Sequence, residues 1–479
     1  MTKFNEFNLS PDILKALDGL GYHEATEVQL QVIPAVLNKE DLVVQSKTGS
    51  GKTASYGIPV CEQMDWEENK PQTLILVPTR ELAVQIQEEL MHIGRFKRLK
   101  VVAVYGKSPF KDQAQQLKQK THIVVGTPGR VLDHLERGTL SLKQMNTLIL
   151  DEADEMLNMG FFETVEMILK MTPQTRQTLL FSATMPTRIK ELANRYLINP
   201  SEIKIESESI ATDLVEHALY SVRMQEKVRL LQDLLTVETP DRCIVFCSTR
   251  EAVEALYQGL KAKGYPTNRL HGGMEQKDRL EVMRNFKMGQ FAFLIATDVA
   301  ARGIDISDLT HVFNFDLPDD QEAFVHRIGR VGRAGKVGKA ITFVTPFETK
   351  LLDQIQKYIG FELPEMERPV ATEVEKAKAA FLTKLKQRPK ASLQKRADTN
   401  NEIMKIYLNG GKKKKLRAID FVGTILSIEG IEKEDIGIID IKDQVTYIDI
   451  LNGKGWTVID GLKTKTIKGK KIKAQKAYN

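Results

Sequence analysis

Short apolar runs alternate with longer amphipathic stretches through the first 360 residues. The runs are rich in Val, Ile and Leu and are too short for helices, so they predict buried strands, and the stretches between them predict helices. This alternation predicts an α/β fold with twisted parallel sheets covered by helices. The predicted strands lie at residues 42–45, 73–77, 101–105, 122–125, 147–150 and 178–181, and then at 243–247, 293–296, 311–315 and 340–344.

A polar segment, ESESIATD at residues 206–213, separates the two series of strands. It predicts a linker between two α/β domains of similar size, at residues 1–206 and 214–364. Residues 365–401 are charged, poor in aromatic side chains and without a strand pattern, so they predict an extension followed by a linker.

The tail, residues 402–479, has the order strand, helix, strand, strand, helix, strand. The predicted strands lie at residues 404–409, 437–441, 445–451 and 466–474, and a short helix at 457–462. The face of the first helix is predicted from the spacing of Leu416, Ile419, Val422, Ile425 and Ile428. This order predicts a ferredoxin-like α+β domain of the kind used by RNA recognition motifs.

Composition indicates a large packed protein that stays in the cytoplasm. Of its 479 residues, 42% are hydrophobic and 28% are charged. No apolar run is long enough to span a bilayer, and the opening MTKFNEFNLSPD is too polar for a secretory signal. The three cysteines, Cys61, Cys243 and Cys247, are too few for a disulfide framework, so we expect buried thiols.

The positive charge of the chain lies in its tail. Residues 402–479 hold 16 Lys and Arg against 10 Asp and Glu, a surplus of 6 that equals the whole net charge of +6. Such asymmetry favours a polyanionic partner, although a solvated lysine face is an alternative explanation. The densest cluster is Lys412, Lys413, Lys414 and Lys415.

The segment SKTGSGKT follows the first predicted strand and precedes a predicted helix. Glycines at this spacing let backbone N–H groups surround a phosphate chain, Lys52 can reach the β and γ phosphates, and the Thr53 hydroxyl suits Mg²⁺. The predicted phosphate-binding residues are Ser46, Thr48, Gly49, Ser50, Gly51, Lys52 and Thr53.

In the segment TLILDEADEML, the four residues DEAD directly after another predicted strand include three carboxylates. In a parallel sheet ligands gather beyond the carboxyl ends of the strands, which predicts that Asp151 organises Mg²⁺ through water, together with Thr53. Glu152 is then placed to orient and deprotonate an attacking water. Alone, these acids also fit an ordinary strand that leaves the core; together with the glycine loop they predict hydrolysis of a nucleoside triphosphate.

The motifs and their order resemble those of DEAD-box ATP-dependent RNA helicases over roughly residues 4–350. Besides SKTGSGKT and DEAD, the matching segments are PTREL, TPGR, SAT, ATDVAARGIDI and HRIGRVGR. The resemblance implies two RecA-like domains, ATP and Mg²⁺ as cofactors, and RNA as the partner, with no membrane and no DNA expected.

The resemblance also implies residues for ATP. Phe4 would stack on adenine, Thr26 and Gln29 belong to the adenine-binding motif, and the Gln29 amide can donate and accept at once. From the second domain, Asp305 would contact the ribose, and Arg330 and Arg333 would be arginine fingers that act only when the two domains close. Ser182, Thr184 and Asp154 would connect the ATP and RNA sites.

For RNA, the resemblance implies contacts with the sugar-phosphate backbone from both domains. The implied residues are Pro78, Thr79, Arg80, Gly106, Thr127, Arg130, Thr249, Gly272, Arg279, Thr297 and Arg302. Judged singly, Arg80 or Arg130 is as easily a surface or helix-capping arginine.

The tail narrows the resemblance to the DbpA group of that family. This implies a helicase directed to a structured hairpin of 23S rRNA, acting on pre-50S particles in large-subunit assembly, and we expect a monomer. Tyr407 either stacks on a base or packs in the tail core. Two other hypotheses stay open: a passive RNA-binding assembly factor, and a nucleotide-driven machine that acts on DNA or protein.

Overall fold

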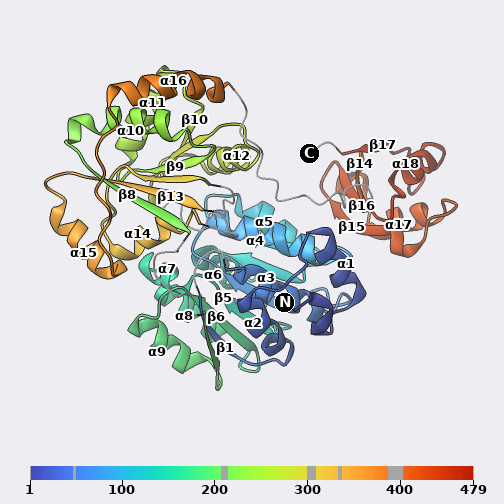
Figure 1. The fold of residues 1–479 in the computed structure, drawn as a ribbon. Coiled ribbons are helices and arrows are strands. Elements are labelled where there is room, and N and C mark those ends of the chain that lie inside the picture. The colour runs from blue at the N-terminus through green and yellow to red at the C-terminus, as the bar shows by residue number, and fades with distance from the viewer. Residues whose placement is uncertain are drawn as a thin grey trace.

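The structure is a computed structural model that describes residues 2–46, 50–205, 214–298, 309–332, 337–386 and 403–477. It contains two parallel sheets with helices on their faces and a smaller antiparallel sheet in the tail (Figure 1). This confirms the predicted fold class. None of the described helices is both long and apolar enough to cross a membrane.

The first sheet has the strand order β3-β4-β2-β5-β6-β1-β7, with parallel pairing throughout. Its strands are β1 (Leu42–Gln45), β2 (Thr73–Leu76), β3 (Val101–Val104), β4 (Ile123–Gly126), β5 (Thr147–Leu150), β6 (Gln177–Ser182) and β7 (Ser201–Lys204). Strands β2 to β6 are buried along their whole length because both faces of the sheet are covered. One apolar core lies on each face.

Helices of the first domain fill the connections between these strands. They are α1 (Pro11–Gly19), α2 (Glu27–Leu37), α3 (Lys52–Gln63), α4 (Arg80–Ile93), α5 (Phe110–Leu117), α6 (Pro128–Glu136), α7 (Ala153–Asn158), α8 (Phe162–Met171) and α9 (Thr187–Tyr196). Local sequence sets several starts: the Thr79 hydroxyl accepts the Leu82 N–H at the beginning of α4, and Pro128 opens α6.

The second sheet has the order β10-β11-β9-β12-β13-β8, also parallel. Its strands are β8 (Val215–Ser221), β9 (Cys243–Phe246), β10 (Thr267–Leu270), β11 (Phe293–Ala296), β12 (His311–Asn314) and β13 (Gly338–Val344). Its helices are α10 (Lys227–Glu238), α11 (Arg250–Ala262), α12 (Gln276–Lys287), α14 (Gln321–Ile328) and α15 (Thr349–Ile359). All three cysteines are buried free thiols, as predicted.

The stretch predicted as extension and linker contains a helix, α16 (Ala371–Leu385). It packs along α10, and its Phe381 ring lies in the core of the second domain beside Tyr265. The extension is therefore part of the second domain at least as far as this helix.

The tail sheet has the order β15-β16-β14-β17 and antiparallel pairing, which is the ferredoxin-like arrangement. Its elements are β14 (Met404–Leu408), α17 (Ala418–Leu426), β15 (Ile436–Ile441), β16 (Thr446–Ile450), α18 (Gly455–Thr464) and β17 (Ala474–Lys476).

Two predictions for the tail are wrong. The last strand lies at Ala474–Lys476, not at 466–474, because Ile467 and Lys470 pair with each other in a tight turn. Ile419 is 70% exposed, so it does not share the buried face of α17 with Phe421 and Ile425.

The tail lies against the first domain, on the side of α1, α4 and α5 (Figure 1). Arg98 donates to the Lys433 carbonyl at 2.7 Å, and the Gln115 amide donates to the Asp443 carboxylate at 3.0 Å. The Gln119 amide reaches the Ile441 carbonyl at 3.4 Å. These contacts place β15, with the turns before and after it, next to the carboxyl ends of α4 and α5.

Candidate functional site

The phosphate-binding segment runs from the end of β1 into α3, at the carboxyl edge of the first sheet. Lys52 is the first residue of α3, is buried, and donates from Nζ to the Ser46 carbonyl at 3.1 Å. Gly51 has a φ of 91°, a left-handed conformation that favours glycine. Ser50 and Thr53 flank these residues, whereas Thr48 and Gly49 lie outside the described part of the chain.

Thr26 and Gln29, at the start of α2, form hydrogen bonds with this loop. The Thr26 hydroxyl donates to the Ser50 carbonyl at 3.1 Å, and the Gln29 amide donates to the Gly51 carbonyl at 3.4 Å while its oxygen accepts the Thr26 N–H. A side chain at position 51 would lie 2.8 Å from the Gln29 amide nitrogen. The motif predicted for adenine is thus packed directly on the phosphate loop.

Phe4 is 4% exposed and its ring packs on Phe7 and Tyr22 within the first core. An adenine could stack on it only after the ring is uncovered. Adenine stacking by Phe4 therefore stays a prediction.

Asp151 lies directly after β5 and is buried. Its Oδ1 accepts the Glu152 N–H at 2.9 Å and its Oδ2 accepts the Tyr56 hydroxyl at 2.8 Å. Burial raises the pKa of Asp151, and the charge of Lys52 opposes that rise. The carboxylate is held in one orientation beside a buried cation.

Glu152 has a φ of 51°, a left-handed conformation unusual for a side chain with a Cβ. Such strain is typical of functional positions. Burial, followed by the neighbouring charge of Asp151, raises the pKa of Glu152 to about 7. Its Oε2 is buried and, among the described residues, has no hydrogen-bond partner. This oxygen is free to accept a proton from a bound molecule.

The donors here suit Mg²⁺. Asp151 and Thr53 present a carboxylate and a hydroxyl oxygen, which are the hard ligands that Mg²⁺ prefers, and it keeps waters in the remaining positions. Burial disfavours the charged form of Asp151 and so raises its pKa, and a bound cation would favour the charged form.

Asp154 joins α7 to the end of β6. Its Oδ2 accepts hydrogen bonds from the Thr184 N–H at 2.7 Å, from the Thr184 hydroxyl at 3.1 Å and from the Ala183 N–H at 3.0 Å. The Asp154 N–H donates to the Ser182 hydroxyl at 3.3 Å. The structure therefore brings together the three residues that were predicted to couple the two sites.

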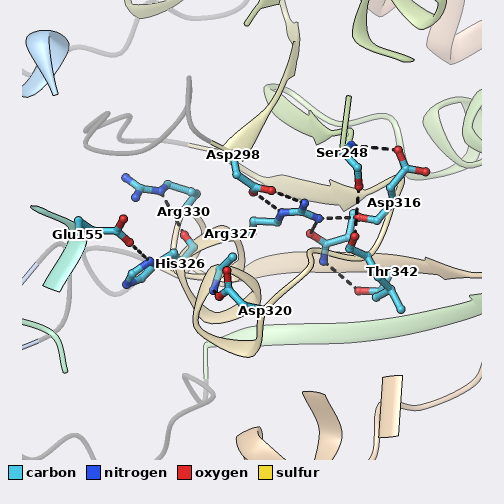
Figure 2. A network of polar contacts seen from close by, with 12 residues as sticks. Glu155, Ser248, Asp298, Asp316, Asp320, His326, Arg327, Arg330 and Thr342 are labelled. Carbon is cyan, nitrogen blue, oxygen red and sulfur yellow. Dashed lines mark hydrogen bonds and ion pairs between the residues drawn. The ribbon is translucent and has the colours of Figure 1, made fainter. Parts of the chain in front are cut away.

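The second domain faces this site through α14. His326 pairs with Glu155 at 2.8 Å across the two domains, and Arg330 donates from Nε to the His326 carbonyl at 3.2 Å (Figure 2). The charge of Arg330 lowers the pKa of Glu152 against the effect of burial, so the guanidinium lies within electrostatic range of that carboxyl. Arg333 and Asp305 lie outside the described residues.

Arg327, one turn before Arg330, was not predicted as a site residue. It is buried, pairs with both oxygens of Asp298 at 2.5 and 2.6 Å, and donates to the Asp316 carbonyl at 2.6 Å (Figure 2). Asp316 in turn pairs with buried Lys227 at 2.8 Å. This network anchors α14 and so fixes where His326 and Arg330 point; its signal in the sequence was an arginine within an otherwise apolar helix face, AFVHRI.

Two of the arginines predicted for RNA each contact a residue of the other domain. Arg80 of the first domain donates to the Gln276 side chain at 2.8 Å, and Arg279 of the second pairs with Glu81 at 2.9 Å. The Gln276 amide also donates to Glu81 at 3.0 Å. This polar cluster, residues 80, 81, 276 and 279, was missed as a unit because its halves are far apart in sequence.

Other residues predicted for RNA have structural partners. Thr79 and Thr249 cap α4 and α11 with their hydroxyls. Arg130 donates to the Ser108 carbonyl at 2.9 Å and the Gln113 side chain at 3.0 Å. The remaining positions are as follows: Pro78 after β2, Gly106 beside Arg80, Thr127 before α6, Gly272 beside Arg250, Thr297 after β11, with Arg302 outside the described residues.

In the tail, a second lysine group joins the predicted one. Lys412–Lys414 form a short 3-10 helix, and Lys468 and Lys470 donate to the carbonyls of Lys415 and Lys414. The run IKGKKIK was not predicted as part of this site. Tyr407 is half-buried on the sheet face opposite buried Ile406 and Leu408, so it does not pack in the tail core, and its ring contacts Tyr447 at 5.8 Å.

Comparison with known proteins agrees with this geometry. The chain matches the DEAD/DEAH box helicase family over residues 26–192, the helicase conserved C-terminal domain over 226–335 and the DbpA RNA binding domain over 405–476. The chain therefore belongs to the DEAD-box ATP-dependent RNA helicases, enzymes that hydrolyse ATP.

Within that family, it is similar over its whole length to the ATP-dependent RNA helicase DbpA of Bacillus subtilis (strain 168). The two are 55% identical over 477 residues, covering 100% of each chain. The DEAD-box helicase CshA of Geobacillus kaustophilus is 45% identical over 78% of this chain and 80% of its own. The solved structure of Dbp5 from S. cerevisiae bound to RNA and ADP BeF3 covers 81% of this chain and 100% of its own, with a TM-score of 0.72 and 29% identity.

Proposed function

We propose that this helicase hydrolyses ATP with Mg²⁺ and, when RNA binds, separates short RNA duplexes locally. One observation supports this most directly: Lys52 and Asp151 of the first domain are buried in the site of Glu152, and the charge of Arg330 from the second domain lowers the pKa of Glu152 against the effect of burial. An ATPase site divided between two domains is complete only when the domains are closed. Hydrolysis is then tied to the closed state.

Lys52 would hold the β and γ phosphates, Thr53 would bind Mg²⁺, and Asp151 would hold it through water. When bound, Mg²⁺ neutralises phosphate charge and orients the leaving group. Glu152 would take the proton of the attacking water on its buried Oε2, and a pKa near 7 suits a base that works at neutral pH. Arg330, joined by Arg333, would stabilise the charge that develops on the γ phosphate.

RNA would bind to both domains along its sugar-phosphate backbone, through Arg80, Arg130 and Arg279 among the residues predicted above. Backbone contacts give affinity without sequence information. If both domains bind one strand only when closed, ATP and RNA both favour the closed state. Each ligand then increases the affinity of the protein for the other. Duplex separation follows from the shape that the closed pair imposes on that strand.

The tail would select the RNA on which the helicase acts. We infer that its two lysine groups bind a structured hairpin of 23S rRNA, so that the motor acts on pre-50S particles in the cytoplasm as a monomer. The match to the DbpA RNA binding domain and the positive surplus of the tail support this target. The paired strands place Tyr407 and Tyr447 together on the sheet face opposite the tail core, where aromatic rings could stack with bases.

The test is ATPase stimulation against a panel of structured RNAs, including 23S rRNA fragments, at a stated salt concentration. We expect one fragment to stimulate hydrolysis at far lower concentration than unstructured RNA. Hydrolysis that ignores RNA would favour a motor for DNA or protein, and duplex separation without ATP would favour a passive assembly factor.

A further inference from the structure

Tyr56 lies on α3 one turn after Thr53, so both side chains occupy the same face of the helix. Its side chain is fully buried, and its ring packs on Phe181 with centroids 5.1 Å apart. Its hydroxyl donates to Oδ2 of Asp151 at 2.8 Å. The hydroxyl group of this buried tyrosine therefore lies in the site where Mg²⁺ would bind.

A phenol has one hydrogen to donate, and Tyr56 uses it on Asp151. The Tyr56 hydroxyl therefore acts on the carboxylate that would organise Mg²⁺, while Thr53 lies one turn earlier on the same helix face.

Core packing alone does not explain this hydroxyl. A phenylalanine would fill the same space against Phe181, and burial of a hydroxyl is unfavourable unless it is hydrogen-bonded. Among the described residues, Tyr56 is the hydrogen-bond donor to Oδ2 of Asp151, whereas Oδ1 is held by the Glu152 N–H. Without the Tyr56 hydroxyl, one oxygen of this carboxylate would lose its fixed direction.

We propose that Tyr56 is a positioning residue of the ATPase site, whose hydroxyl fixes the side chain of Asp151 for Mg²⁺. The proposal rests on the proposed function, because it deepens the role given there to Asp151. Partners that orient metal ligands typically change metal affinity about 10- to 100-fold when removed. We expect the lower end, because Lys52 and the Glu152 N–H still act on Asp151.

The experiment compares full-length wild type with Tyr56→Phe by binding of a fluorescent ADP analogue at increasing Mg²⁺ concentration. The variant should need about 10-fold more Mg²⁺ for half of the Mg²⁺-dependent gain in affinity, with unchanged affinity in EDTA. ATP hydrolysis should recover as Mg²⁺ rises, because the ring and the catalytic carboxylate remain.

Two variants serve as controls. Tyr196→Phe removes a hydroxyl that bonds Glu166 at 3.0 Å, away from the site in the same domain. Phe181→Leu loosens the ring packing but keeps the Tyr56 hydroxyl. Both should titrate with Mg²⁺ like wild type.

Wild-type Mg²⁺ dependence in Tyr56→Phe would overturn the proposal, and so would an equal shift in Phe181→Leu, which would assign the effect to packing. Failure of the proposed function looks different, since wild type itself would then show no RNA-stimulated ATP hydrolysis.

Discussion

The contact between Glu81 and Arg279 allows the energetics of domain closure to be tested through one carboxylate. The two side chains belong to different domains, lie 2.9 Å apart and are only 7% and 11% exposed. Glu81→Gln keeps the shape of the side chain and its hydrogen bond with Gln276, but removes the charge that faces Arg279.

At an effective dielectric constant of about 20, unit charges at this separation attract by roughly 6 kcal/mol. Desolvation of both groups offsets much of that attraction, and close charge pairs across interfaces show coupling energies of about 1.5–7 kcal/mol. The variant retains a neutral hydrogen bond, so we expect closure to weaken by about 2 kcal/mol. That corresponds to about a 30-fold change in equilibrium constant.

The assay is RNA-stimulated ATPase, with the RNA concentration for half-maximal stimulation as the readout. Glu81→Gln should raise it about 30-fold, whereas Glu88→Gln, an exposed carboxylate on the same helix, should leave it unchanged. In an Arg279→Gln background the Glu81→Gln substitution should change this RNA concentration little, because the partner of Glu81 is already neutral. An equal cost of Glu81→Gln in both backgrounds would refute the reasoning, since the effect would not depend on the pair.

Three further outcomes are expected. Glu152→Gln should abolish turnover while ATP still binds, as measured by ATPase and nucleotide-binding assays; hydrolysis at the wild-type rate would reject Glu152 as the base. Removal of residues 402–479 should keep stimulation by general RNA but lose the preference for one fragment, and Lys468→Ala with Lys470→Ala should reduce that preference partly; preference unchanged in both would argue against anchoring by the tail. Burial lowers the pKa of His134 to about 4, so the folded state favours the neutral ring. The resulting stabilisation should be fully present above about pH 6.5 and should be lost between about pH 6.5 and 4. This loss should lower the free energy of unfolding by at most about 3 kcal/mol. His134→Gln should flatten the fall of the unfolding temperature between pH 7 and pH 5, and an unchanged slope would contradict this assignment.

Central strands were predictable from sequence because burial on both sheet faces requires continuous apolar runs. Strands β7, β8 and β10 were missed for the converse reason. They lie at sheet edges, and the sequences SEIK and TNRL of β7 and β10 are largely polar because those strands are partly exposed. In VEHALYS of β8, Glu216 and His217 interrupt the apolar pattern.

The site divides in a similar way. Lys52, Asp151 and Glu152 were predictable because each follows a strand that ends at the same sheet edge. The pairing of Glu81 with Arg279, and the anchoring of Arg327 by Asp298, depend on how separate segments pack, and no local pattern reports such contacts. The lysine run near the end of the chain was missed because its proximity to Lys414 and Lys415 arises only when the tail sheet forms.

The tail follows helix α16 of the second domain but contacts the first domain. Phe381 fixes this helix to the second helicase domain, whereas Arg98 and Gln115 of the first domain contact the tail itself. The tail is thus tethered to one half of the motor and rests on the other. Any change in the separation of the two halves therefore moves α16 relative to the surface of the first domain on which the tail rests.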